Sequence, residues 1–241
     1  MATADIPLAR RTHAVSGNGQ AKVWRKLLAF GTLVLLFAAV LFIFVKPIRH
    51  LLPLPPNDKL LAMRTADGRL LGHFPYPEAR ESQLVFVSPG MKLHQEAAQA
   101  YLAMEQAAAA DGVSLSLLSA FRSVDDQKHL FFGVKAQRNQ SSFERAKVSA
   151  PPGFSEHSTG FAIDIGDSQQ PNSNLSQTFT QTRAYRWLQN NAARYQFTLS
   201  FPKNNPQGVS FEPWHWRYEG SVDALRLFEP AQRLRRGTPG N

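Results

Sequence analysis

The 241-residue chain contains no cysteine. This absence excludes a disulfide framework, and it also excludes any metal site built from thiolates. A metal bound by this protein must therefore be held by histidines and carboxylates. The absence says little about the cellular compartment, because a domain with a sizeable core needs no disulfides.

Acidic residues are fewer than basic ones, but the imbalance lies at the two ends of the chain. The formal net charge is +9. Residues 1–59 contribute +6 and residues 226–241 contribute +3, whereas residues 60–225 hold fifteen residues of each sign. A nucleic-acid-binding domain usually carries a basic excess of its own. The neutral body therefore argues against nucleic acid as a partner.

One long stretch lacks charge altogether. Residues 27–45 are nineteen uncharged, mostly apolar residues with basic residues on both sides. As a helix they would rise ~1.5 Å per residue and span about the ~30 Å hydrocarbon layer of a membrane. A cleaved signal peptide is the main alternative, but its apolar region is normally ~7–15 residues long, and no Ala-x-Ala site follows here. We expect an uncleaved transmembrane anchor.

The anchor divides the chain into unequal parts. Five Lys or Arg residues precede residues 27–45 and three follow closely, which favours a cytoplasmic tail over residues 1–26 and an external C-terminal domain. Residues 46–58 include a proline-rich segment that is typical of a stiff, extended linker. We expect the folded domain over residues 59–228 and a basic tail over residues 229–241.

Local patterns in the domain predict both helices and strands. Asp67 and Gly68 between two apolar segments indicate a hairpin. The remaining predicted elements are helices over residues 91–111, 124–138 and 182–195, and strands over residues 114–121, 161–165 and 211–218.

Two of the seven histidines lie in unusual surroundings. His157 precedes Asp164 by seven residues, and His215 follows in a segment rich in aromatic residues. A hydrolytic zinc site needs three His or carboxylate ligands and a free position for water. On one uninterrupted strand His157 and Asp164 would face opposite sides, so a turn must intervene, and Gly160 is placed to provide it. Asp164 lies in an apolar strand, where a carboxylate is costly unless paired or metal-bound.

Glu212 could complete such a site as the base that moves a proton to and from water. It precedes Pro213, which favours an extended backbone, so helical periodicity does not place it next to His215. From the residues alone, a zinc site and a core with two hydrogen-bonded histidines both remain open.

Three separate motifs in the sequence resemble one family. They are residues 119–123 followed by Gln127, residues 155–164, and residues 212–218. The pattern S-x-H-x-x-G-x-A-x-D is met in full by Ser155, His157, Gly160, Ala162 and Asp164. In this order the motifs resemble the VanY-type D-Ala-D-Ala carboxypeptidases, in the superfamily of the lysostaphin-type enzymes and the hedgehog signalling domain. The resemblance covers about residues 91–218.

The resemblance implies a role for each matching residue. The implied Zn²⁺ ligands are His157, Asp164 and His215, and the implied catalytic residues are Glu212 as general base and Arg122 as the group that steadies the scissile carbonyl or a substrate carboxylate. Arg122, Gln127, Ser155 and Trp214 are the implied substrate contacts. Phe121 stands where the family often has tyrosine, which puts one hydroxyl contact in doubt.

The expected fold is α+β, with a small antiparallel sheet that carries the zinc site, flanking helices and one N-terminal transmembrane helix. The expected activity is zinc-dependent removal of the terminal D-alanine from peptidoglycan stem peptides, outside the bacterial cytoplasmic membrane. An L,D-carboxypeptidase or endopeptidase acting on the same material, a non-catalytic zinc-containing module that binds the cell wall, and a structural envelope protein stay open as alternatives.

Overall fold

The computed structural model describes residues 58–237. The predicted tail, anchor and most of the linker, residues 1–57, lie outside the described residues. Among residues 58–237, no helix has the length and apolar character that a membrane crossing requires.

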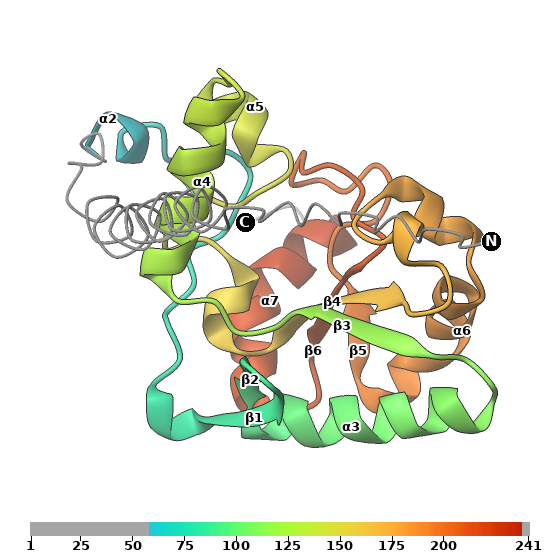
Figure 1. The fold of residues 1–241 in the computed structure, drawn as a ribbon. Helices are drawn as coiled ribbons and strands as arrows, with labels where there is room; N and C mark the ends of the chain where they lie inside the picture. The colour runs from blue at the N-terminus through green and yellow to red at the C-terminus, as the bar shows by residue number, and fades with distance from the viewer. Residues whose placement is uncertain (1–57, 238–241) are drawn as a thin grey trace, which may run out of the picture. The chain divides into compact units, whose positions relative to one another are not determined.

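A four-stranded antiparallel sheet forms the centre of the domain (Figure 1). Its strands lie in the order β3 (Leu115–Ser119), β4 (Ala162–Asp167), β6 (His215–Tyr218) and β5 (Phe197–Leu199). A separate hairpin pairs β1 (Leu84–Ser88) with β2 (Met91–His94). The small antiparallel sheet of the predicted α+β fold is confirmed.

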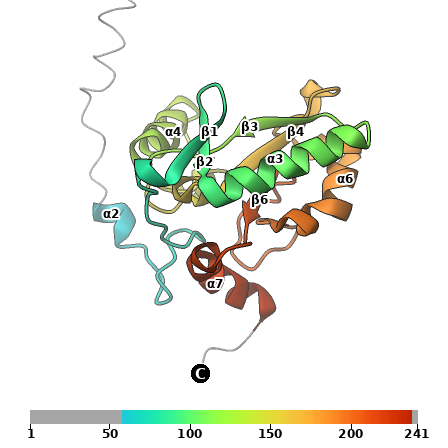
Figure 2. The same cartoon turned by 90° about the horizontal axis from the view of Figure 1, so that it is seen from below.

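Helices flank this sheet, as predicted. The helices of the described residues are α2 (Asp58–Leu61), α3 (Gln95–Ala110), α4 (Val124–Gln137), α5 (Ser142–Ala146), α6 (Arg183–Asn191) and α7 (Val222–Arg236). Of these, α3 and α6 pack directly against strands of the sheet. Short 3-10 turns fill the connections, namely Glu81–Gln83, Glu156–Thr159, Pro171–Ser173, Gln177–Gln181 and Ala192–Tyr195. In Figure 1, α3 runs beneath the strands, while α4 and α5 lie above them; Figure 2 shows α3 and α7 as separate layers.

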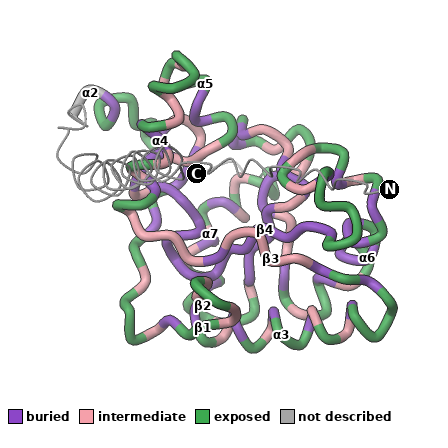
Figure 3. Tube along the Cα trace, in the orientation of Figure 1, coloured by how far each residue is buried: buried purple, intermediate pink, exposed green. Residues whose placement is uncertain are grey.

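The core lies between α3 and the sheet. The buried face of α3 includes Ala97, Tyr101, Met104 and Ala108, which recur at helical spacing. The opposing central strand β4 is buried at all six positions: β3 and β6 pair with its two edges, and α6 packs against it. Figure 3 shows β4 buried along its length, whereas the outer side of α3 is exposed. A carboxylate in β4 is therefore removed from bulk water.

Several local predictions need correction. The hairpin around Asp67 and Gly68 is reduced to isolated bridges that join Arg64 to Leu70 and Leu70 to His73. The helix predicted from residue 91 begins at Gln95, because the first four residues form β2. The strand predicted over residues 211–218 begins only at His215.

The C-terminal boundary also differs. We predicted a basic tail from residue 229, but α7 continues through this position to Arg236. Phe228 and Ala231 are buried in the core, so the packed face of α7 crosses the predicted boundary. The basic residues of the helix end, Arg233, Arg235 and Arg236, stand in its last turn, where positive charge complements the helix dipole.

Candidate metal centre and substrate cleft

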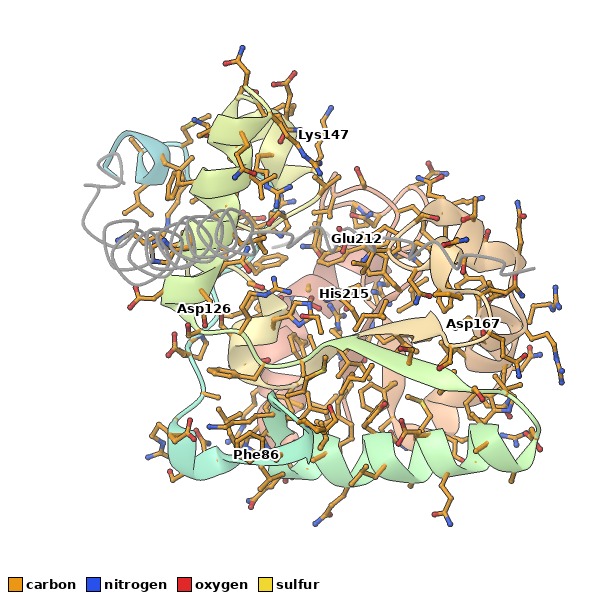
Figure 4. The ribbon with its side chains drawn as sticks, viewed as in Figure 1. Phe86, Asp126, Lys147, Asp167, Glu212 and His215 are labelled. Atoms are coloured by element: carbon orange, nitrogen blue, oxygen red, sulfur yellow. The ribbon has the colours of Figure 1, made fainter. Side chains whose placement is uncertain are left out.

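Adjacent strands place two of the predicted metal ligands side by side. Asp164 of β4 and His215 of β6 are direct partners in the antiparallel register. Directly opposed residues share one face of a sheet, so both side chains point the same way. Figure 4 shows His215 near the middle of the domain, whereas Asp167 lies toward the far end of β4.

The third residue, His157, comes from the 3-10 turn before β4. Gly160 ends this turn with φ 72°, in the left-handed region. A Cβ atom at this position would lie 2.9 Å from the backbone nitrogen of His94, so glycine is also required by space. The predicted turn at Gly160 is thus present, and it lets His157 approach Asp164.

The three side chains form a compact, buried group. Each offers one ligand atom, and these atoms lie within 4.8 Å of one another. His157 Nε2 is 3.3 Å from Asp164 Oδ2, and His215 Nδ1 is 3.1 Å from Asp164 Oδ1. All three predicted ligands are therefore brought together.

The second nitrogen of each ring is held by the protein. His157 Nδ1 lies 2.8 Å from the carbonyl oxygen of Ala120, and His215 Nε2 lies 3.0 Å from Glu156 Oε2. When these nitrogens carry the proton and donate it, His157 Nε2 and His215 Nδ1 keep their lone pairs toward Asp164. Metal-binding histidines are usually fixed in this way by a carbonyl or carboxylate. The donor set therefore fits Zn²⁺, with two imidazoles, one carboxylate and room for a fourth ligand.

The electrostatics of the group also favour a cation. Burial by itself raises the pKa of Asp164, but His157 and His215 outweigh it and hold that pKa well below its usual range. Burial lowers the pKa of His215, but its hydrogen bonds to Asp164 and Glu156 outweigh this and raise the pKa to about 10. Positive charge is thus strongly preferred between these carboxylates, whether a proton or a metal supplies it.

A buried ion network that the sequence analysis missed supports His215. Glu156 accepts hydrogen bonds from Ser200 Oγ at 2.6 Å and from Arg217 Nη1 at 2.9 Å, in addition to its contact with His215. Arg217 is fully buried and its Nε donates to Glu219 at 2.6 Å. The pKa of Glu156 is low although burial raises it, because Arg217 and His215 favour the charged carboxylate. The sequence signal for this network was the position of Glu156, a charged residue directly before the expected metal ligand His157.

Replacing Glu156 should weaken metal binding without removing a ligand. Glu156→Gln keeps an acceptor for His215 but loses the negative charge, and changes of this kind typically cost ~10–100-fold in metal affinity. Zinc affinity measured by competition with a chelator checks this, and Glu81→Gln on the exposed surface serves as the control. An unchanged affinity in a folded Glu156→Gln protein would show that this carboxylate does not tune the site.

Glu212 lies beside the metal group without being one of its three members. The backbone nitrogen of His215 donates to the carbonyl oxygen of Glu212, and this turn brings Glu212 Oε2 to 3.9 Å from His215 Nδ1 (Figure 4). Burial raises the pKa of Glu212 to about 8, while His215 and Arg122 act in the opposite direction. The side chain is thus close to the metal group and holds a proton more tightly than an ordinary glutamate.

Arg122 approaches the same group from the segment between β3 and α4. Its Nη2 donates to Ser119 Oγ at 2.7 Å and its Nη1 donates to Gln127 Oε1 at 2.8 Å. Gln127 in turn donates to the carbonyl oxygen of Ala150 at 2.6 Å and to Ser149 Oγ at 3.2 Å. Gln127 was predicted as a substrate contact; what the structure shows is that its Oε1 accepts a hydrogen bond from Arg122 and helps to fix that guanidinium.

The three residues of the metal group line one cleft of about 440 Å³ together with Glu212, Arg122 and Gln127. Ser155 and Trp214, the other two predicted substrate contacts, line the same cleft. Two further aromatic residues of the 212–218 motif, Trp216 and Tyr218, are buried in the core. The cleft also contains residues of the α4–α5 region that the sequence analysis did not single out, namely Leu130, Arg138, Arg145 and Val148. Its volume suits a small ligand or the end of a peptide.

Two known proteins are similar to this chain in sequence. YodJ of Bacillus subtilis (strain 168) is 37% identical over 134 residues, which cover 55% of this chain and 48% of YodJ. The chain thus spans about half the length of YodJ. The D-alanyl-D-alanine carboxypeptidase of Enterococcus faecalis (strain ATCC 700802 / V583) is 26% identical over 243 residues, with 88% of each chain covered.

Two solved structures share the fold. The LdcB LD-carboxypeptidase is 30% identical with a TM-score of 0.56, and the match covers 68% of this chain and 80% of that one. A variant of the vancomycin resistance D,D-pentapeptidase VanY, in complex with Zn(II), is 27% identical with a TM-score of 0.51. That match covers 65% of this chain and 89% of the other.

The VanY family model, described as D-alanyl-D-alanine carboxypeptidase, matches residues 90–221. This range is more than half of the chain, and it includes the metal group, Arg122, Glu212 and the strands that position them. The chain therefore belongs to the VanY family of D-alanyl-D-alanine carboxypeptidases.

Proposed function

We propose that this protein is a zinc-dependent D-alanyl-D-alanine carboxypeptidase that trims peptidoglycan stem peptides. The observation that carries the proposal is the buried group of His157, Asp164 and His215 in a cleft that also holds Glu212 and Arg122. Family membership and the Zn(II) complex of a VanY relative support the reaction class and the metal.

The three ligands of the proposed zinc site are His157 through Nε2, His215 through Nδ1 and one oxygen of Asp164. When bound, Zn²⁺ acts as a Lewis acid toward the scissile carbonyl and lowers the pKa of a coordinated water toward ~7. The protein contributes fixed ligand orientation, since Ala120 and Glu156 hold the other ring nitrogens.

Glu212 is the proposed proton carrier. Its carboxylate would take the proton of the attacking water and deliver it to the nitrogen of the leaving alanine. A group with a pKa of about 8 is suited to both steps near neutral pH, and the positive charge of a bound cation would bring the value lower. Its Oε2 lies 3.9 Å from His215 Nδ1, so the carboxylate stands beside the residues that would hold the metal.

Arg122 is the proposed stabiliser of negative charge on the carbonyl oxygen. Hydrogen bonds to Ser119 and Gln127 hold its guanidinium in place before substrate arrives, so little reorganisation is needed during the reaction. The presence of both Glu212 and Arg122 also argues against a module that only binds the cell wall, because binding alone has no use for a proton carrier.

The L,D specificity of LdcB keeps a second candidate in view, because that structure resembles this chain in both sequence and fold. Digestion of defined muropeptides followed by mass spectrometry separates the candidates. A D,D-carboxypeptidase removes one alanine from a pentapeptide that ends in D-Ala-D-Ala and leaves the tetrapeptide intact. Removal of alanine from the tetrapeptide alone would replace our proposal with an L,D-carboxypeptidase, and cleavage of cross-linked dimers would indicate an endopeptidase.

We also propose that residues 27–45 anchor the protein in the bacterial cytoplasmic membrane, with the catalytic domain on the outer side where peptidoglycan lies. The uncharged run and the basic residues before it support this topology. Protease added to intact spheroplasts should digest the domain, and its protection there would contradict the proposed orientation.

A further inference from the structure

Arg145 is a buried arginine that has no counter-ion in the described part of the chain. The residue is 6% exposed, and its Nε is buried without a hydrogen-bond partner. Within residues 58–237 no carboxylate lies within ion-pair distance of its guanidinium. Burying an unpaired charge is costly, so a structural arginine in such a place would normally have an acidic partner.

The other arginines near the cleft show the contrast. Arg217 is paired with Glu156 and Glu219, and Arg122 donates to Ser119 and Gln127. Arg145 instead faces further positive charge. Burial lowers the pKa of Arg145, and the nearby Arg138 and Arg122 lower it further, while Glu212 only partly compensates. Positive charge is therefore concentrated on this side of the cleft, and Glu212 offsets it only in part.

The backbone around Arg145 is firmly held. Ser141 and Glu144 form a reciprocal capping box at the start of α5. At its other end, the carbonyl oxygen of Ala146 lies 2.7 Å from His73 Nε2. Burial lowers the pKa of His73 to about 4, so this ring is neutral at physiological pH and donates from Nε2. Arg145 is thus presented from a fixed turn.

Arg145 and the exposed Arg138 line the same cleft as the proposed zinc ligands. We propose that Arg145, assisted by Arg138 at the mouth of the cleft, forms a subsite for a carboxylate of the substrate peptide. The proposal rests on the proposed peptidase function and specifies its substrate as a peptide with a free carboxylate that reaches Arg145 in the cleft. Guanidinium groups bind carboxylates through two parallel hydrogen bonds, which favours Arg145 over a simple basic patch.

Arg122 is proposed to stabilise the carbonyl oxygen, and its surroundings agree with that role. It is tied to Ser119 and Gln127 and lies near Asp164 and Glu212, at the reacting end of the cleft. A second arginine without internal partners implies a second anionic group on the ligand. A stem peptide offers two sources of such a group, its C-terminal carboxylate and the free carboxylates of its acidic residues.

Three peptides separate these sources: a stem pentapeptide with free carboxylates, the same peptide with a C-terminal carboxamide, and the same peptide with its acidic residues amidated. The full-length, zinc-loaded protein and Arg145→Gln are compared with each by steady-state kinetics and by calorimetric binding. Arg194→Gln, an exposed arginine outside the cleft, is the matched control.

With the free pentapeptide, we expect Arg145→Gln to raise KM and the dissociation constant by ~10–100-fold, with a smaller change in kcat and unchanged zinc content. One of the two amidated peptides should bind the wild type as poorly as the free pentapeptide binds Arg145→Gln. The same amidated peptide should show no further loss of binding with Arg145→Gln, and this identifies the recognised carboxylate. Arg138→Gln should show a weaker effect of the same kind.

Equal losses for all three peptides, or no loss for any, would overturn the subsite. If Arg145→Gln does not fold, Arg145→Lys keeps the charge but loses the paired hydrogen bonds, and it should give an intermediate loss with the same dependence on the peptide. The binding arm also separates this proposal from the reaction itself. A wild type that binds the peptides in an Arg145-dependent manner but cleaves none retains the subsite and refutes the peptidase function.

Discussion

Glu212→Gln is expected to hydrolyse the stem pentapeptide at least ~10²–10⁴-fold more slowly than the wild type, with its zinc still bound. The substitution keeps the size of the side chain and removes the group that takes and returns the proton. Because Glu212 is not one of the three residues that form the metal group, the zinc content should not change. Rates by mass spectrometry and zinc by elemental analysis, measured on the same preparation, check both halves.

Arg122→Ala provides a comparison within the same cleft. It should also keep zinc, and it should lose ~10²–10³-fold in rate through weaker stabilisation of charge on the carbonyl oxygen. Glu81→Gln, on the exposed surface, should have wild-type activity. If Glu212→Gln retains the wild-type rate with zinc bound, another residue moves the proton and the mechanism proposed above is wrong.

The sequence predicted the metal group because its members are local or carry a recognisable pattern. His157, Gly160 and Asp164 lie within eight residues, and the need for a turn between them follows from the alternation of side chains along a strand. His215 was added by its motif and not by any local rule. Its position opposite Asp164 depends on the pairing of β4 with β6, which joins residues 51 positions apart.

The ion network around Glu156 was not predicted, because it too depends on the pairing of distant strands. Glu156 is next to His157 in the sequence, yet its partners Ser200, His215 and Arg217 lie 44 to 61 residues away. If the sheet register is not known, Glu156 cannot be distinguished from an ordinary polar residue in a turn. A buried carboxylate needs a partner at Glu156 as much as at Asp164, but the local sequence does not show that Glu156 is buried.

Arg145 shows a different limit of sequence reasoning. Arg145 is proposed as a subsite because it has no acidic partner among the described residues. This absence is a property of the folded cleft, and the local sequence does not show it. Glu144 is its neighbour in the sequence, but that carboxylate is used in the cap of α5. The two secondary-structure errors near β2 and β6 likewise arose where strand pairing, which is non-local, overrode a plausible local pattern.

The largest effect on metal binding is expected from His157→Ala and His215→Ala, each of which should reduce zinc content from one per chain to near zero. Each change leaves two of the three donors in a buried group, and two donors hold Zn²⁺ far more weakly than three. Asp164→Ala should also lower metal affinity, unlike Glu212→Gln and Arg122→Ala, because it removes a ligand. His129→Ala, at an exposed position outside the metal group, is the matched control.

Thermal unfolding gives a second measure of the same site. A metal that binds only the folded protein stabilises it by ~2.7 kcal/mol when its free concentration is 100 times the dissociation constant. Zinc should therefore raise the Tm of the wild type and of Glu212→Gln, and a chelator should reverse this rise. Neither histidine variant should respond to zinc or chelator. Full zinc occupancy in both, with a Tm that still depends on zinc, would place the metal elsewhere and remove the basis of the proposed function.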